Sequence, residues 1–386
     1  MAKRGVLHSG YVLFFVVVLF LASCRKDIGK FCECKQDDMV ASVSVFASGL
    51  NNPRGLTFGP NGDLYVAEGG IGGTDSTTGK CTQVIPPVGP YKGSTTGARI
   101  LKVDKYGKIT TVADSLPSSQ TAVTLGSFVS GVADVAFIGN TLYGLLGGAG
   151  CSHGVSGIPN GIVKVHSNKS WDLVANLSDW QMGHPVAKPE QDDFEPDGTW
   201  YGMVAVDGNL YAVEPNHGEI VKVTPNGNIE RLIDISASQG HIVPTAITWH
   251  DGNFYVGNLD VFPITGKSNV YKVTPAGQIS IVEKGFSAIL GIAFDKSGGM
   301  YVLENTTGNA NPTPGTGDII RIDQSGNRRT LVTGLNLPTA LQYGPDGNLY
   351  VSNWGFGPPA IGGGQILKVT IDCDRNRNMN WHDLIK

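Results

Sequence analysis

Oxygen-bearing side chains recur at one position of a repeated tyrosine pattern. Three residues after each recurring tyrosine stand, in chain order, Glu68, Leu146, Glu214, Asn258, Glu304 and Asn353. Carboxylates and amides are oxygen ligands that hard divalent cations such as Ca²⁺ prefer. If the repeats close into a ring, symmetry places three carboxylates and two amides as a girdle around one channel mouth. The alternative, that these residues cap strand ends and bind loop backbone, stays open.

Histidines lie in the loops beside these strands. His153, His184, His217 and His241 fall in connections of the second to fourth repeats, and the densest polar loop is Glu214 to Gly218. Neutral imidazoles also bind metals, and converging carboxyl groups without a cation should leave at least one of them resistant to ionisation. The predicted ligand-binding residues are Glu68, Glu214, Asn216, His217, His241, Asn258, Glu304 and Asn353.

A second group of oxygen ligands ends the chain, in the tail 372–386. With Asp372 as the first position of a calcium loop, the predicted metal ligands are Asp372, Asp374, Asn376, Asn378 and Asp383. This spacing follows calcium-loop ligand positions and resembles the first half of a dockerin. Arg377 replaces the glycine of the sharp turn and no second copy follows, so calcium binding and a merely polar tail both remain open. Calcium or another divalent cation is the only cofactor that the sequence suggests.

Short repeated strands must position these residues. Six tyrosine-bearing segments share the pattern of Pro53 to Glu68, and five of them are followed by a complete segment similar to Ala98 to Ala113. Both segments consist of a strand, a turn rich in Gly, Asn or Asp, and a second strand. One repeat is therefore four strands, and a repeat of this length predicts a radial or stacked architecture.

The last repeat lacks one strand. Gly364 to Ile371 supplies one strand where the other repeats have two, and Val40 to Phe46 has the pattern of the missing one. Closing a ring removes exposed sheet edges. The sequence therefore predicts an all-β fold over residues 39–371. It is a six-bladed β-propeller with four-stranded blades, whose N-terminal strand closes the last blade.

Length variation is confined to the second and fourth connections of the repeat. The long connections are Gly69 to Gly97, Asp114 to Gly131, Gly147 to Asn160, Ser178 to Thr199 and Asn305 to Gly317. In an antiparallel blade these connections leave from the same face. The opposite face therefore has only short turns, and we call it the trimmed face, whereas the elaborated face carries the long loops. Loops on a rigid scaffold commonly carry binding residues. We therefore expect binding on the elaborated face.

The N-terminus predicts export. Lys3 and Arg4 precede an apolar run from Tyr11 to Ala22, which is shorter than the roughly 20 residues that span a bilayer. Leu21 to Cys24 matches the bacterial lipobox. We predict a signal peptide over 1–23, lipidation of Cys24, a tether over 24–38, and a lipid-anchored location in the cell envelope, periplasmic or on the outer surface. An ordinary signal peptide is the alternative.

The remaining cysteines are expected to pair in this oxidising compartment. Cys81 and Cys151 lie in loops of neighbouring blades, which predicts a disulfide between them. Cys373 follows the last strand and has Cys32 or Cys34 as its candidate partner, with one thiol left over.

Composition and motifs narrow the function classes. The net charge of -4, with no Lys/Arg cluster after the tether, argues against nucleic acid as a partner. No GxSxG, HExxH, P-loop or dinucleotide fingerprint occurs in the chain. We expect a monomer that binds a small molecule or an extracytoplasmic protein.

Several separated motifs resemble the ScyD/ScyE family of propellers. They are NNPRGLTFGPNGDLYVAEGGIGGT, the PPVGPYKGSTTGARILKVD segment, VEPNHGEIVKV and VPTAITWHDGNFYVGN. The resemblance implies an exported six-bladed propeller related to NHL repeats and no defined reaction. A lipid-anchored binding or scaffold protein is the first interpretation. The alternative is a metal-dependent hydrolase similar to the six-bladed lactonases, although Pro53 and Arg54 stand where those enzymes carry a ligand Glu.

Overall fold

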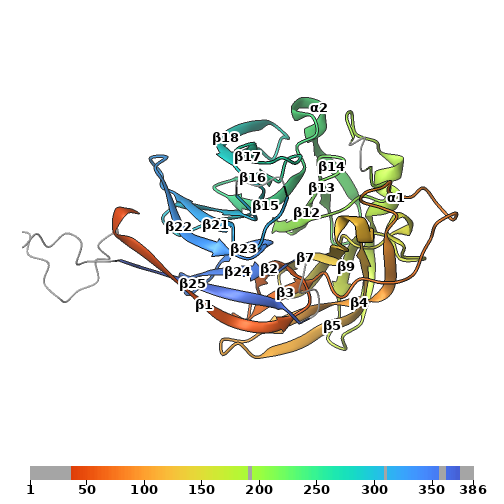
Figure 1. The fold of residues 1–386 in the computed structure, drawn as a ribbon, viewed down its shortest axis with the longest axis horizontal. Helices are drawn as coiled ribbons and strands as arrows, with labels where there is room; N and C mark the ends of the chain where they lie inside the picture. Colours follow the sequence, from red (N-terminus) through yellow and green to blue (C-terminus); the bar gives the residue numbers. More distant parts are fainter. Residues whose placement is uncertain (1–35, 190–193, 308–310, 356–361, 374–386) are drawn as a thin grey trace, which may run out of the picture. The chain divides into compact units, whose positions relative to one another are not determined.

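Six antiparallel sheets form the blades of a propeller (Figure 1). The computed structural model describes residues 36–189, 194–307, 311–355 and 362–373. Five sheets have four strands, and the first has a short fifth strand, β6, which pairs with the end of β5. The predicted all-β, six-bladed propeller is confirmed. No helix within these ranges is long and apolar enough to cross a membrane.

Each blade begins with its innermost strand. Blade 1 contains β2 (Pro53–Phe58), β3 (Leu64–Glu68), β4 (Lys92–Val103), β5 (Ile109–Gln120) and β6 (Val129–Ser130). Blade 2 contains β7 (Val132–Ile138), β8 (Thr141–Leu146), β9 (Gly161–Val165) and β10 (Trp171–Asn176). Blade 3 contains β11 (Gly202–Val206), β12 (Asn209–Glu214), β13 (Glu219–Val223) and β14 (Ile229–Asp234).

The second half of the ring repeats this order. Blade 4 contains β15 (Pro244–His250), β16 (Asn253–Asn258), β17 (Ser268–Val273) and β18 (Ile279–Phe286). Blade 5 contains β19 (Ile289–Phe294), β20 (Met300–Glu304), β21 (Gly317–Ile322) and β22 (Arg328–Leu335). Blade 6 contains β23 (Ala340–Tyr343), β24 (Leu349–Asn353), β25 (Gly364–Cys373) and β1 (Met39–Leu50).

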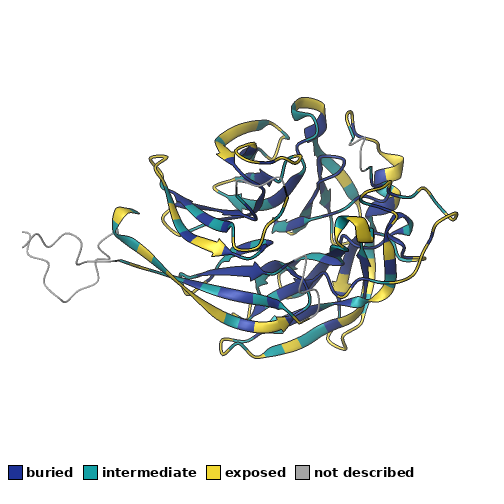
Figure 2. Cartoon of the chain, viewed as in Figure 1, coloured by how far each residue is buried: buried dark blue, intermediate teal, exposed yellow. Residues whose placement is uncertain are grey.

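The six first strands contact one another in a closed circle. Apolar side chains from each pair of neighbouring blades form a cluster between them, so the core is a set of wedges. Buried residues, dark blue in Figure 2, lie on strands around the ring. The recurring tyrosines belong to these wedges. Tyr65, for example, packs edge-on against Phe137 at the end of the next blade's first strand, with ring centroids 4.8 Å apart.

The N-terminal strand closes the ring as predicted. β1 pairs antiparallel with β25 from Met39 opposite Cys373 to Leu50 opposite Gly364. The burial along β1 is uneven, since Ala47 and Leu50 are buried whereas Val43 and Val45 are exposed. β1 therefore contributes more by pairing its backbone than by filling the core.

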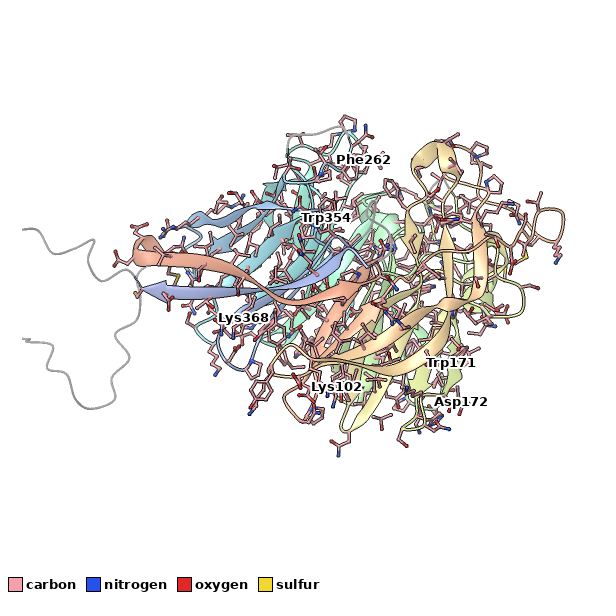
Figure 3. The ribbon with its side chains drawn as sticks, turned by 60° about the horizontal axis from the view of Figure 1, so that its bottom comes forward. Lys102, Trp171, Asp172, Phe262, Trp354 and Lys368 are labelled. Carbon is pink, nitrogen blue, oxygen red and sulfur yellow. A yellow bond between two sulfur atoms is a disulfide. The ribbon has the colours of Figure 1, made fainter. Side chains whose placement is uncertain are left out.

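The trimmed face carries a repeated ion pair. The basic residue of the third strand reaches the acidic residue of the first turn of its own blade. Lys102 Nζ lies 3.1 Å from an oxygen of Asp63, and Lys368 Nζ lies 2.8 Å from one of Asp346 (Figure 3). These ion pairs link the third strand to the first turn of the same blade, and the turn stays short.

The long connections leave the opposite face, as the strand order requires, and we call this side the loop face. It carries η2 (Val123–Leu125), η3 (Cys151–His153), α1 (Leu177–Gly183) and α2 (Ile235–Gln239), and η1 (Gln36–Asp38) precedes β1. The described part excludes the predicted signal peptide, tether residues up to 35, Cys24, Cys32, Cys34, Asp374, Asn376, Asn378 and Asp383.

Candidate functional site

The polar residues that end the second strands act as clamps on their own blades. Glu68 Oε1 accepts the backbone N–H of Asn51 at 2.8 Å, and Asn353 Oδ1 accepts that of Asn336 at 2.8 Å. Glu214 and Glu304 accept backbone N–H groups in the same way, from Thr199 and Ser287. Each donor lies in the segment that leads into the blade's first strand, so the side chain fixes that segment.

Two blades solve the same problem differently. Asn258 donates from Nδ2 to the carbonyl of Ile242 at 2.8 Å and accepts the N–H of Asn269 at 2.6 Å. Leu146 has no polar atom, and in blade 2 the N–H groups of Gly147 and Gly148 bond to the carbonyl of Gly131. The equivalent backbone bond also occurs in blades with a polar residue, for example from Gly69 to Asn52, so the polar side chain adds a second hydrogen bond to the same segment.

These clamps do not form the predicted girdle. A channel cavity of about 390 Å³ runs along the axis, and its lining comes from the six first strands and residues next to them. Glu68, Glu214, Asn258, Glu304 and Asn353 end second strands, one layer further out, and are almost fully buried. The expectation that they converge on the axis is wrong, because the innermost strands occupy it. A ligand-binding role for them stays a prediction.

One carboxyl pair does show the expected resistance to ionisation, but inside a blade. Glu304 and Asp318 are paired residues of β20 and β21. Burial, and next the neighbouring Asp318, raise the pKa of Glu304 to about 8. The pair therefore holds a proton at neutral pH.

The densest group of ionisable residues lies where the loops of three blades meet. We call it the loop cluster, and its members are Tyr91, His153, Glu195, Asp197, Glu214, Asn216 and His217. Tyr91 precedes β4 in blade 1, His153 ends η3 in blade 2, and Glu195 and Asp197 lie between α1 and β11. The other three residues belong to the end of β12 and the turn after it. All seven are at most 6% exposed, so this is a buried network rather than an open cavity.

Glu195 links all three blades. Tyr91 Oη donates to Glu195 Oε1 at 2.7 Å, and His153 Nε2 lies 3.3 Å from Glu195 Oε2. The backbone N–H of Glu195 donates to Asn216 Oδ1 at 2.9 Å. Asp197 adds a second link, since the hydroxyl of Ser152 donates to its Oδ2 at 2.9 Å.

Neighbouring carboxylates favour the charged form of both histidines of the loop cluster. Burial alone would lower the pKa of His153, but the carboxylates of Glu195, Asp197 and Glu214 raise it above its usual value. His217 behaves likewise, with its Nδ1 lying 3.2 Å from Glu214. Burial would raise the pKa of Glu214, but the imidazole of His217 and the backbone N–H groups of Thr199 and His217 together lower it. The loop cluster is thus a set of buried ion pairs.

A disulfide ties the same loops together. Cys81 and Cys151 are bonded, as predicted, and join the long loop of blade 1 to η3. Cys373 is also disulfide-bonded, and its predicted partners Cys32 and Cys34 lie outside the described residues. Because Cys151 is two residues from His153, the covalent link and the ion pairs restrain one loop unit.

The other predicted residues lie elsewhere. His241 precedes β15 in blade 4, and His184 stacks on Trp180 at a centroid distance of 3.6 Å. Sequence reasoning missed Tyr91, Glu195 and Asp197, because they belong to insertions without a repeat. The sequence signal that could have revealed them is the acidic segment before Gly198, together with the histidines in the neighbouring loops.

The donors needed for a catalytic metal are not assembled among the described residues. They contain no group of three or more His, Cys, Asp or Glu side chains placed to hold an ion. The channel lining includes one carboxylate, Asp134, and both its oxygens accept backbone N–H groups. Asp372, the first predicted calcium ligand, lies in β25 opposite Val40. Within the part of the chain that the structure describes, no donor set of the lactonase type is assembled.

Comparisons with known proteins place the fold and nothing finer. No family model and no curated protein matches the chain. Similar solved structures include a protein of unknown function from Bacteroides thetaiotaomicron, at 13% identity, TM-score 0.54, and coverage of 86% of this chain and 76% of that one. A putative glucose dehydrogenase from Thermus thermophilus has 18% identity, TM-score 0.52, and coverage of 86% and 100%. A gluconolactonase from Xanthomonas campestris has 9% identity, TM-score 0.51, and coverage of 86% and 90%. The structural neighbours of this chain are six-bladed β-propellers.

Proposed function

We propose that this chain is an exported, lipid-anchored binding protein that recognises an extracytoplasmic partner protein with the loops of blades 1 to 3. The observation that carries the proposal is the loop cluster, which joins these three sets of loops through buried ion pairs beside the Cys81–Cys151 disulfide. Loops already held in one conformation lose little entropy on binding. Membership of the ScyD/ScyE family, supported by the sequence motifs, is part of the same proposal.

Apolar side chains stand exposed on this preorganised unit. Ile71 and Ile85, on the long loop of blade 1, are 47% and 51% exposed, and Val123 in η2 is 85% exposed. Exposed apolar side chains are energetically useful where a partner covers them. They support a protein partner over a soluble small molecule at this face.

Site-directed photocrosslinking in the native cell envelope tests this proposal. A crosslinking amino acid would replace Ile71, Ile85 or Val123 on the loop face, and Tyr106 or Lys169 in exposed turns of the trimmed face as controls. We expect one discrete adduct from the loop-face positions and none of that size from the controls. Equal adducts from both faces, or none from either, would refute loop-face recognition.

The hydrolase alternative gains no support from the described donors. Structural similarity to a gluconolactonase at 9% identity supports the fold and not the activity. A lactonase-type reaction would need several oxygen ligands around one cation, and the channel offers one carboxylate that is already hydrogen-bonded twice.

A further inference from the structure

The axial channel holds one carboxylate, that of Asp134. Its Oδ1 accepts the N–H of Val135 at 2.8 Å, and its Oδ2 accepts the N–H of Met203 in the next blade at 2.7 Å. A Cβ atom on Gly55 would lie 1.8 Å from Asp134 Oδ1, so the carboxylate rests directly on blade 1 as well. Only glycine leaves room for it there.

No cation compensates Asp134 among the described residues. The cavity lining contains no Lys, Arg or His side chain, and Asp134 forms no ion pair within the described ranges. Burial raises its pKa to about 7, against the lowering effect of the two backbone N–H groups. The charged form of Asp134 has two hydrogen bonds but no cationic partner in the described cavity lining, so an ammonium group brought there would stabilise it.

Tyr201 separates this cavity from the loop face. Its hydroxyl donates to the carbonyl of Thr339, which belongs to the opposite side of the ring, at 3.1 Å. Tyr201 lines both the axial cavity and a small cavity of about 30 Å³ beside Arg54. Tyr201 therefore narrows the end of the axial cavity that faces the loops.

The trimmed end of the cavity suits an apolar body with polar edges. Phe58, Phe137 and Trp249 border it there, although their rings also pack in the wedges between blades. The hydroxyl-bearing Thr57 and Thr248 lie beside them. Phe137 lies three residues along β7 from Asp134, a separation of roughly 10 Å. The volume of about 390 Å³ is in the range of small-molecule sites.

We propose that the axial channel is a binding site for a small primary amine, whose ammonium group pairs with Asp134 and whose apolar body lies among Phe58, Phe137 and Trp249. The two oxygens of Asp134 each already accept one N–H, which leaves enough for a charge-assisted hydrogen bond but is poor for coordinating a metal. This site is independent of loop-face recognition.

Calorimetry on the full chain in detergent tests the proposal with two matched probes. The probes are 2-phenylethylamine and its neutral isostere 2-phenylethanol. We expect the amine to bind roughly tenfold to a hundredfold more tightly than the alcohol, the worth of one charge-assisted hydrogen bond. Equal affinities for the two probes, or no heat from either, would overturn the amine site while leaving the loop-face proposal intact.

Two variants and a control locate the interaction. Asp134→Asn should abolish the preference for the amine, whereas Asp114→Asn, at an exposed position of β5, should leave it unchanged. Ala205→Leu enlarges a residue that lines the cavity and packs between blades 2 and 3, and it should weaken the binding of both probes. If Asp134→Asn does not fold, loss of binding in folded Ala205→Leu still locates the site. Unaltered amine binding in either folded variant refutes it.

Discussion

At the scale of single residues, the repeated polar position is explained by the need of a buried backbone N–H for a hydrogen-bond acceptor. A buried N–H without a partner is costly, and the segment that leads into each first strand presents one. Glu68, Glu214, Glu304 and Asn353 all accept such an N–H despite their different charges. Charge at this position is therefore secondary to the presence of an acceptor oxygen.

Removing one clamp should be costly because the group is fully buried. Glu214→Ala leaves the N–H of Thr199 and the charged His217 without their partner, so we expect a loss of roughly 3–5 kcal/mol of unfolding free energy. Glu214→Gln keeps an acceptor and should lose less. The control Glu230→Ala, whose side chain is 76% exposed, should change stability by under about 1 kcal/mol. Chemical denaturation measures all three, and equal losses for Glu214→Ala and Glu230→Ala would contradict the clamp role.

The Glu304 and Asp318 pair predicts a pH dependence. The folded pKa of Glu304, about 8, lies above its ordinary value of 4.5, so the folded state keeps an extra proton between these pH values. Stability should therefore be fullest below about pH 4.5 and fall as pH rises to about 8. Asp318→Asn removes the neighbouring carboxyl and should raise Tm relative to wild type more at pH 8 than at pH 5. Asp114→Asn serves as the control, and parallel curves for Asp318→Asn and wild type would contradict the prediction.

At the scale of elements, the ring depends on a strand that is remote in sequence from the blade it completes. β1 contributes an antiparallel ladder to β25, and Phe46 packs edge-on against Tyr350 with ring centroids 5.2 Å apart. Without β1, the backbone of β25 would be an open edge. Because the valines of β1 are exposed, its stabilising effect comes from backbone pairing with β25 and from the packing of Phe46 and Leu50.

Deleting the closing strand should open the ring. A chain beginning at Asn51 loses the buried Leu50, worth about 1.5–3 kcal/mol, and the half-buried Phe46, so we expect a loss of at least about 2 kcal/mol. The matched control Val43→Ser changes an exposed residue of the same strand and should have little effect. Differential scanning calorimetry measures both, and an unchanged Tm for the shortened chain would contradict closure by β1.

At the scale of the whole molecule, the two faces of the propeller differ in kind. The loop face is built from insertions held by a disulfide and buried ion pairs, whereas the trimmed face has short turns and opens on the axial cavity. The hydroxyl of Tyr201 bonds to the carbonyl of Thr339 on the opposite side of the ring. A protein partner on one face and a small molecule from the other would therefore not compete.

The lipid anchor is the prediction at this scale. Replacing Cys24 by Ser should move the protein from the membrane fraction to the soluble fraction, because the lipidated sulfur would be lost. Cys32→Ser, eight residues further along, is the control and should stay with the membrane. Fractionation with immunoblotting measures this. Membrane association of Cys24→Ser equal to that of wild type would exclude the anchor.

The amino-acid sequence by itself determined the number of blades, the closing strand and the disulfide between neighbouring loops. Repeats and alternating apolar residues are local patterns, and the pairing of Cys81 with Cys151 followed from their equivalent loops. Only the tertiary structure decided how far each polar residue lies from the axis. The residues that end the second strands lie outside the channel, and Asp134 is the carboxylate in its described lining. It also assembled Tyr91 and Glu195 with His153, because residues in unrepeated insertions meet through packing that no period encodes.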